Sequence, residues 1–179
     1  MASTTTRLMT VEEFDKLPEP QAYSHELRKG VLVKVARPVF RHTRAQKRLV
    51  RLLEDAACNT EVAFVEVPFR PLPEYEVRAA DVAYAPQERW LKVNPSGYFL
   101  GVPDLIVEIL SPSNRTGEML EKEQICLENG CREFWIVDLD RRQVKISTPD
   151  GRTAVYKAGQ SIPLFFASGK HLDVDAIFA

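Results

Sequence analysis

Three acidic side chains stand in or beside stretches of apolar and small residues. Glu108 lies in "LIVEIL", Asp81 in "RAADVAYA", and Glu26 in "SHELRKG", next to the apolar "VLVKVA". An isolated buried carboxylate is costly unless it is paired, protonated or bound to a metal. Carboxylate oxygens are the ligands that Mg²⁺ prefers, and the histidines and cysteines are not spaced as a zinc site would need. The pattern therefore indicates a cation site built from oxygen ligands.

These carboxylates also have a structural interpretation. An acidic residue in a strand can be exposed or can pair with a basic side chain, and for Glu26 both interpretations stand. Asp104 follows Pro103 and can simply open the strand, so we interpret it as structural. Glu108 is different, because its strand is apolar on both faces and strands of that kind are normally covered on both sides. Its expected burial favours a functional role.

A lysine on the apolar side of a helix is the next candidate. Met119, Lys122 and Cys126 are three and four residues apart, which places the ammonium on the stripe that faces the core. The helix rises about 10 Å from its start to Lys122, and the preceding strand spans about 7–10 Å back to Glu108. If the helix folds back along the strand, Lys122 returns to the level of Glu108. Its ammonium would there orient a water and stabilise negative charge, and pairing with an acid of its own helix is the alternative.

Basic residues are the candidates for contact with an anionic substrate. The net charge is −1, so nucleic-acid binding would need a local basic patch. One face of the long helix carries basic residues at helical spacing, namely Arg44, Lys47, Arg48 and Arg51. Arg78 and Arg115 lie near the acids in sequence and are further candidates for phosphate contact. A charged stripe on a helix is also typical of a solvated face.

Hydrophobic periodicity and turn residues predict the elements that hold these side chains. Helices are expected over 11–17, over 41–58 and from the turn "SPSN" to about 129. Strands are expected over 61–72, 77–86, 104–110, 132–140 and 143–150, with a hairpin turning at Gly30 and a loop over 86–103. The tail adds strands within 154–166 and a short helix after Asp173. Mixed strands flanked by two longer helices indicate an α/β fold.

Length and composition set the broad class. A chain of 179 residues without a repeat or linker suits a single domain over 1–179. The three cysteines are irregularly spaced and odd in number, which favours reduced thiols and a cytoplasmic location. The N-terminus has no signal-peptide pattern, and no apolar run approaches the roughly 20 residues that cross a bilayer. We therefore expect no membrane association.

The order of four motifs resembles a known family. "HELRKGVLV", "RAADVAYA", "PDLIVEILSPS" and "EKEQICLENGCREFWIVD" are similar to the Uma-type endonuclease family, within the PD-(D/E)XK or restriction-endonuclease-like superfamily. The resemblance covers 11–164. It implies a mixed central β-sheet flanked by helices, with a core over about 11–140 and a C-terminal extension of β-hairpins over 141–179.

The resemblance also implies roles for the residues already singled out. Asp81 and Glu108 match the metal-binding acids, Glu26 matches the acid from the early part of the fold, and the backbone carbonyl of Ile109 would complete the coordination of Mg²⁺ or Mn²⁺. The superfamily's usual lysine position is Leu110 here, and Lys122 takes its place from the following helix.

The sequence departs from the family pattern at three positions. Ala80 replaces the proline that usually precedes the metal-binding acid, and Cys126 replaces a tyrosine four residues after the lysine. Val31 stands where a second early glutamate is often found. The main acids and the lysine all remain.

Three hypotheses about function follow from these residues. The first is a metal-dependent nuclease that hydrolyses phosphodiester bonds of nucleic acid, DNA in particular, as a homodimer. The second is a non-catalytic nucleic-acid-binding or assembly module that keeps the fold. The third is a phosphodiesterase that acts on small molecules with the same site.

Overall fold

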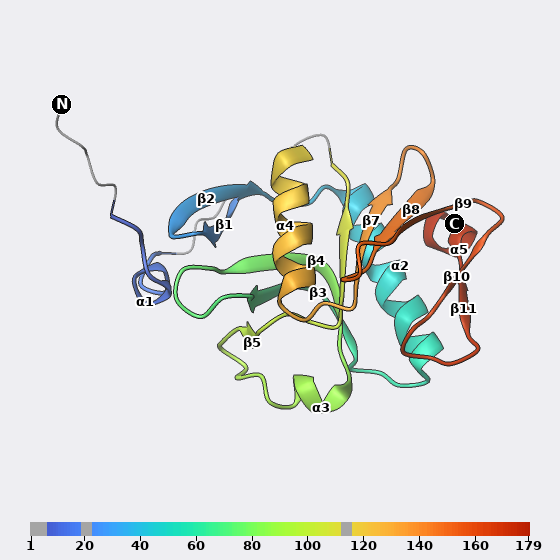
Figure 1. Cartoon of the computed structure of the whole chain (residues 1–179), viewed down its shortest axis with the longest axis horizontal. Coiled ribbons are helices and arrows are strands. Elements are labelled where there is room, and N and C mark those ends of the chain that lie inside the picture. The colour runs from blue at the N-terminus through green and yellow to red at the C-terminus, as the bar shows by residue number, and fades with distance from the viewer. Residues whose placement is uncertain (1–6, 19–22, 112–115) are drawn as a thin grey trace.

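The computed structural model describes residues 7–18, 23–111 and 116–179 (Figure 1). Its helices are α1 (Val11–Phe14), α2 (Phe40–Ala57), α3 (Gln87–Trp90), α4 (Thr116–Glu128) and α5 (Val174–Phe178). Its strands are β1 (Tyr23–Arg28), β2 (Val31–Ala36), β3 (Ala63–Arg70), β4 (Arg78–Tyr84), β5 (Phe99–Leu100), β6 (Leu105–Ile109), β7 (Glu133–Asp138), β8 (Gln143–Ser147), β9 (Thr153–Lys157), β10 (Ser161–Pro163) and β11 (His171–Asp173). The described helices are all too short or too polar to span a bilayer.

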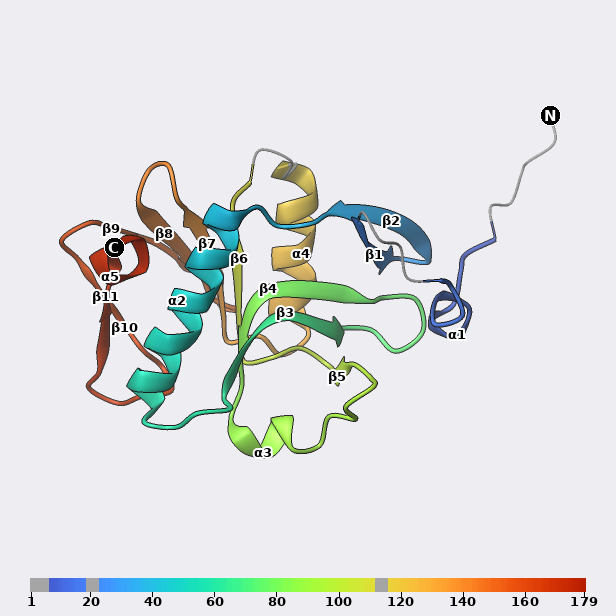
Figure 2. The same ribbon diagram turned by 180° about the vertical axis from the view of Figure 1, so that it is seen from behind.

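A seven-stranded mixed sheet in the order β5-β3-β4-β6-β7-β8-β9 forms the centre of the molecule. Strands β6 and β7 run parallel, as β3 and β5 do, and the other neighbours are antiparallel. Helix α4 crosses one face of the sheet in Figure 1, and Figure 2 shows α2 on the opposite face. This arrangement confirms the predicted mixed sheet between two longer helices.

Strand β6 lies in the middle of the sheet because its residues are apolar on both faces. All of its residues are buried. Leu105, Val107 and Ile109 pack in the hydrophobic cluster that contains α2, whereas Ile106 packs in the cluster that contains α4. A central strand covered on both sides is what such a continuous apolar run predicts. Glu108 therefore interrupts a buried strand, as expected.

The two long helices keep the boundaries and faces that periodicity predicts. The apolar stripe of α2, which includes Ala45, Leu49 and Leu53, is buried. The helix ends at Ala57, and the C-cap residue Cys58 takes the left-handed conformation with φ of 51°. Helix α4 ends before Gly130, whose φ of 108° suits glycine best.

The β1–β2 hairpin is attached to the central sheet through β1. Its two-residue turn, Lys29 and Gly30, has positive φ values of 48° and 74°, as the favoured hairpin turns require. A Cβ atom added at Gly30 would lie 2.6 Å from the Cβ of Leu8, so a larger residue does not fit there. Leu27 and Val77 exchange backbone hydrogen bonds of 2.9 Å. This bridge brings the neighbouring Glu26 close to the start of β4.

Some elements differ from the prediction. Helix α1 has only one turn, and the expected loop over 86–103 contains α3 and β5. The C-terminal extension has two parts, because β8 and β9 continue the central sheet while β10 and β11 form a separate hairpin. Helix α5 then contacts α2. The "SPSN" turn falls largely on 112–115, outside the described residues.

Candidate active site

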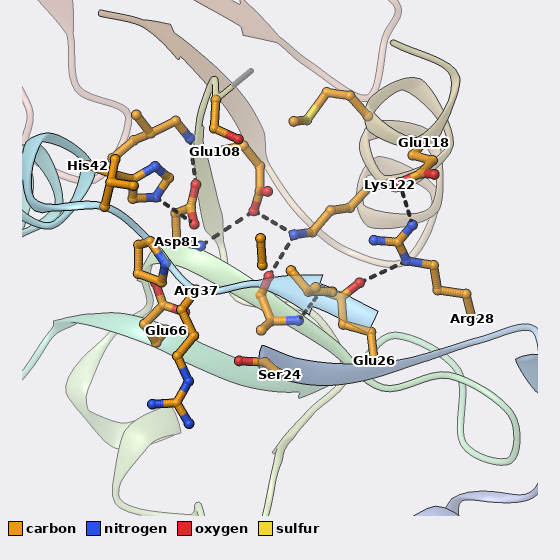
Figure 3. A pocket seen from close by; sticks show the side chains of 18 residues that line it. Ser24, Glu26, Arg28, Arg37, His42, Glu66, Asp81, Glu108, Glu118 and Lys122 are labelled. Carbon is orange, nitrogen blue, oxygen red and sulfur yellow. Dashed lines mark hydrogen bonds and ion pairs between the residues drawn. The ribbon is translucent and has the colours of Figure 1, made fainter. Parts of the chain in front are cut away.

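A pocket of about 300 Å³ opens beside the middle of the sheet, between β1, β4, β6 and the two long helices. Its walls bring together six polar side chains from separate parts of the chain, namely Glu26, His42, Glu66, Asp81, Glu108 and Lys122 (Figure 3). These residues come from six elements, so the pocket exists only in the folded protein.

Asp81 and Glu108 are fixed to each other's backbone across the β4–β6 pair. Oδ2 of Asp81 accepts a hydrogen bond of 2.7 Å from the backbone N–H of Ile109, the residue after Glu108. Oε1 of Glu108 lies 3.4 Å from the backbone N–H of Asp81. Each carboxylate is thus oriented by the neighbouring strand, and Oδ1 of Asp81 and Oε2 of Glu108 take no part in these backbone hydrogen bonds. Ile109 itself also lines the pocket.

Lys122 reaches Glu108 from α4, at the level that helix rise and strand length predict. Its side chain is buried, with 7% of the residue exposed. Its Nζ lies 2.7 Å from Oε1 of Glu108 and donates a hydrogen bond of 2.6 Å to the backbone carbonyl of Ala79. Among the described residues, Lys122 does not pair with an acid of its own helix. Glu118 contacts Arg28 instead, at 2.8 Å.

Glu26 is buried in the same pocket but has partners for both oxygens. Oε1 accepts a hydrogen bond of 3.0 Å from the backbone N–H of Ala79, and Oε2 lies 2.8 Å from Nε of Arg28. Burial acts to raise its pKa, but the nearby Lys122 ammonium and Arg28 guanidinium hold the pKa below its ordinary value. Glu26 is therefore ionised and contributes negative charge beside Lys122.

The charge balance around Glu108 fits a site for a cation. Burial raises the pKa of the Glu108 carboxyl to about 8, although the Lys122 ammonium lowers it, and the charge of Asp81 raises it further. The pKa of Lys122 is raised by Glu108, Glu26 and Asp81 in spite of its burial. The pocket is lined by five acids against three basic side chains, namely Glu26, Glu66, Asp81, Glu108 and Glu118 against Arg28, Arg37 and Lys122. Two neighbouring carboxylates in a lining where acids outnumber basic groups suit a divalent cation.

Two polar residues of the pocket were not among the candidates from the sequence. His42, at the start of α2, has its Nε2 3.0 Å from Oδ1 of Asp81, and Glu66 of β3 lies opposite Asp81. One ligand atom from each of these three residues lies within 4.8 Å of the other two. His42 stands three residues before Ala45 on the apolar stripe of α2, and Glu66 interrupts the apolar run "AFVEVPF". Both signals are of the kind that identified Lys122 and Glu108.

Three of the arginines expected to bind phosphate, Arg44, Arg48 and Arg78, do not line this pocket. Arg78 corrects our expectation, because its side chain is fully buried and Nη2 pairs at 2.8 Å with Glu76. Arg44 and Arg48 line a separate hollow beside α5, where Nη1 of Arg48 donates to the Ile177 carbonyl at 3.3 Å. Arg115 lies outside the described residues.

Two acidic residues near these elements have structural roles. Asp104, before β6, forms an ion pair of 2.5 Å with Arg89, which agrees with its structural interpretation. Glu123 on α4 is buried and pairs at 2.9 Å with Lys145 of β8. Neither lines the pocket.

A mixed sheet between α2 and α4, with acids on β4 and β6 and a lysine returning from α4, defines a restriction-endonuclease-like protein. The chain belongs to the Uma2 family, described as "Putative restriction endonuclease", which it matches over residues 11–175. A crystal structure of a protein from Anabaena variabilis, described as a "putative nuclease", is similar in fold with a TM-score of 0.79. The two sequences are 24% identical, and the likeness covers 95% of this chain and 97% of the other. No curated protein matches the chain significantly.

Proposed function

We propose that this protein is a divalent-metal-dependent endonuclease that hydrolyses phosphodiester bonds of DNA with Mg²⁺ or Mn²⁺. The observation that carries the proposal is the convergence of Asp81, Glu108 and Lys122, from three different elements, on one pocket. Membership of a nuclease family supports the reaction class. The free thiols of Cys58, Cys126 and Cys131 support a cytoplasmic location.

Asp81 and Glu108 would hold the cation through the oxygens that they do not use for backbone hydrogen bonds, and the Ile109 carbonyl would complete the ligand set. A divalent cation supplies polarisation of the scissile phosphate and a water of lowered pKa. Glu26 was expected to be a further ligand. Because Ala79 and Arg28 engage both of its oxygens, we assign it a positioning role, in which its charge keeps Lys122 protonated.

Lys122 would stabilise the negative charge that develops on the phosphate. Its ammonium is held by Glu108 and by the Ala79 carbonyl, so it is oriented before substrate binds. A preorganised donor of this kind acts without reorganisation during the reaction. The long stem of the side chain is buried along α4, which keeps the ammonium from moving into bulk solvent.

The DNA backbone would approach over the start of α2. Arg44, which is exposed, and Arg48, which is half-buried, lie on that helix, and arginines can contact phosphates without reading sequence. Cleavage of both strands would need two active sites, and we expect a homodimer. Strand β9 is the last strand of the central sheet, and its outer edge is suited to pairing with a second copy.

The test is cleavage of plasmid DNA and of a matched RNA with Mn²⁺, Mg²⁺ or a chelator. We expect metal-dependent cleavage of DNA that is abolished by Asp81→Asn and strongly reduced by Lys122→Ala. Asp140→Asn and Lys29→Ala are matched controls, because these acidic and basic residues lie outside the pocket. Tight DNA binding with neither cleavage nor a response to metal would refute the proposal in favour of a non-catalytic binding module.

A further inference from the structure

His42 is the least satisfied polar group of the pocket. It is buried, with 7% of the residue exposed, and it points from α2 towards Asp81 (Figure 3). Its Nε2 lies 3.0 Å from Oδ1 of Asp81. The direction from the ring does not suit a hydrogen bond, and Nε2 has no hydrogen-bond partner among the described residues. When the ring is protonated this contact is an ion pair, and when the ring is neutral the same two atoms can bind a cation between them.

An unusual backbone conformation at Glu66 places its side chain beside His42 and Asp81. The β3–β4 ladder pairs Val65 with Val82 and Val67 with Ala80, but it omits the position between them, where Glu66 faces Asp81. Glu66 has a φ of 50°, a left-handed conformation that is rare for a residue with a side chain. Such a conformation persists where the surroundings determine it, and it is common at functional sites.

Gln46 links Glu66 to Asp81 from the next turn of α2. Its amide Nε2 donates to the Glu66 carboxylate and, at 3.2 Å, to the backbone carbonyl of Asp81. A buried amide that orients a carboxylate is a typical supporting interaction behind a metal ligand. Glu66 and Asp81 are therefore positioned by groups outside the cluster, Gln46 and the backbone N–H of Ile109.

The distances suit one ion. Two ligand atoms on adjacent corners of an octahedron with bonds of about 2.1 Å lie about 3.0 Å apart, and Nε2 of His42 and Oδ1 of Asp81 are 3.0 Å apart. Mg²⁺ prefers oxygen ligands, whereas first-row transition cations accept imidazole. We propose that His42, Glu66 and Asp81 form a cation position beside the Asp81–Glu108 position, and that its imidazole ligand makes the pocket prefer a first-row transition cation to Mg²⁺. The inference rests on the proposed function, because both positions share Asp81.

The experiment uses Mn²⁺ as the probe, because its paramagnetism reports the ligands directly and independently of cleavage. Pulsed electron paramagnetic resonance of Mn²⁺ bound to the full chain should show hyperfine coupling to an imidazole nitrogen. The coupling should disappear in His42→Asp, which offers oxygen in place of nitrogen, and persist in His171→Ala, an exposed histidine outside the pocket. The ratio of Mn²⁺ to Mg²⁺ affinity should fall about tenfold or more in His42→Asp.

The outcomes separate this inference from the proposed function. Bound Mn²⁺ without nitrogen coupling in the wild-type protein, together with metal-dependent cleavage, would overturn the inference and leave the nuclease proposal standing. Nitrogen coupling that survives in His42→Asp would also overturn it. A Glu66→Gln variant should bind Mn²⁺ more weakly while keeping the nitrogen coupling. An unchanged Mn²⁺ affinity in this variant would show that Glu66 is not a ligand. Cleavage that persists in Asp81→Asn would count against the proposed function itself.

Discussion

Replacing Glu108 with glutamine should change how the stability of the metal-free protein depends on pH. Burial, with the opposing effect of Lys122 and the added charge of Asp81, raises the pKa of the folded carboxyl from 4.5 to about 8. Between these two values the folded state keeps a proton that the unfolded state releases. Stability from this group is therefore lost as pH rises through that window, by at most about 1.4 kcal/mol per pH unit. A glutamine at this position has no proton to release.

The free energy of unfolding of the wild-type protein, relative to Glu108→Gln, should fall by about 2–4 kcal/mol between about pH 5 and pH 8. The lower part of this range applies if the titrations of Glu108 and Lys122 are coupled, because the proton loss is then spread over both groups. Urea denaturation in chelator at several pH values measures the difference, and titrating groups remote from Glu108 cancel between the two proteins. Glu123→Gln is the matched control, since it changes a buried, paired acid that does not line the pocket. A constant difference between wild type and Glu108→Gln across this range would refute the reasoning.

Three further predictions concern the pocket, the core and the hairpin. Lys122→Ala should lower the single-turnover rate of DNA cleavage by about 10²–10³-fold while Mn²⁺ still binds; a rate within about tenfold of wild type would exclude the proposed role. Leu53→Ala should cost about 2–5 kcal/mol in urea denaturation, because the side chain is fully buried against the sheet; a cost under about 1 kcal/mol would contradict that packing. Gly30→Ala should destabilise the protein by about 1–2 kcal/mol more than Gly151→Ala in the same assay. Both glycines have positive φ, +74° at Gly30 and +80° at Gly151, but only an alanine at position 30 would place its Cβ against Leu8. Equal losses of stability in the two variants would show that Leu8 moves aside without cost.

Local patterns were enough to predict the elements that carry the site. An apolar run of strand length with one acid predicted a central strand with a buried Glu108, and β6 has that form. Helical spacing placed Lys122 on the core-facing stripe of α4, and the lengths of strand and helix placed it near Glu108. These inferences succeeded because helix and strand periodicity are fixed by the backbone itself.

The parts that the sequence did not predict depend on a break in regular structure. Residues two apart in a strand normally face the same side, yet Ala80 packs in the cluster that contains α4 and Val82 in the cluster that contains α2. The alternation changes at Asp81, where the β3–β4 ladder is interrupted opposite Glu66. Strict alternation along this strand would predict one face running from Val77 to Ala85, and the strand departs from it at Asp81.

Closeness in sequence was also a poor guide to the arginines. Arg78 is three residues from Asp81, but its guanidinium turns to a buried partner, Glu76, because a charge excluded from solvent needs an opposite charge. The basic face of α2 instead lies over a different hollow, which Arg44 and Arg48 line.

The sequence by itself determined the two long helices and the main strands of the sheet, the family, and the burial of one acid and one lysine. Only the tertiary structure decided which side chains share the pocket, and it added His42 and Glu66 to Asp81. The physical reason is that periodicity is a local property of the chain. The order of strands in the sheet, and the side of it on which a helix lies, follow from contacts between residues far apart in sequence.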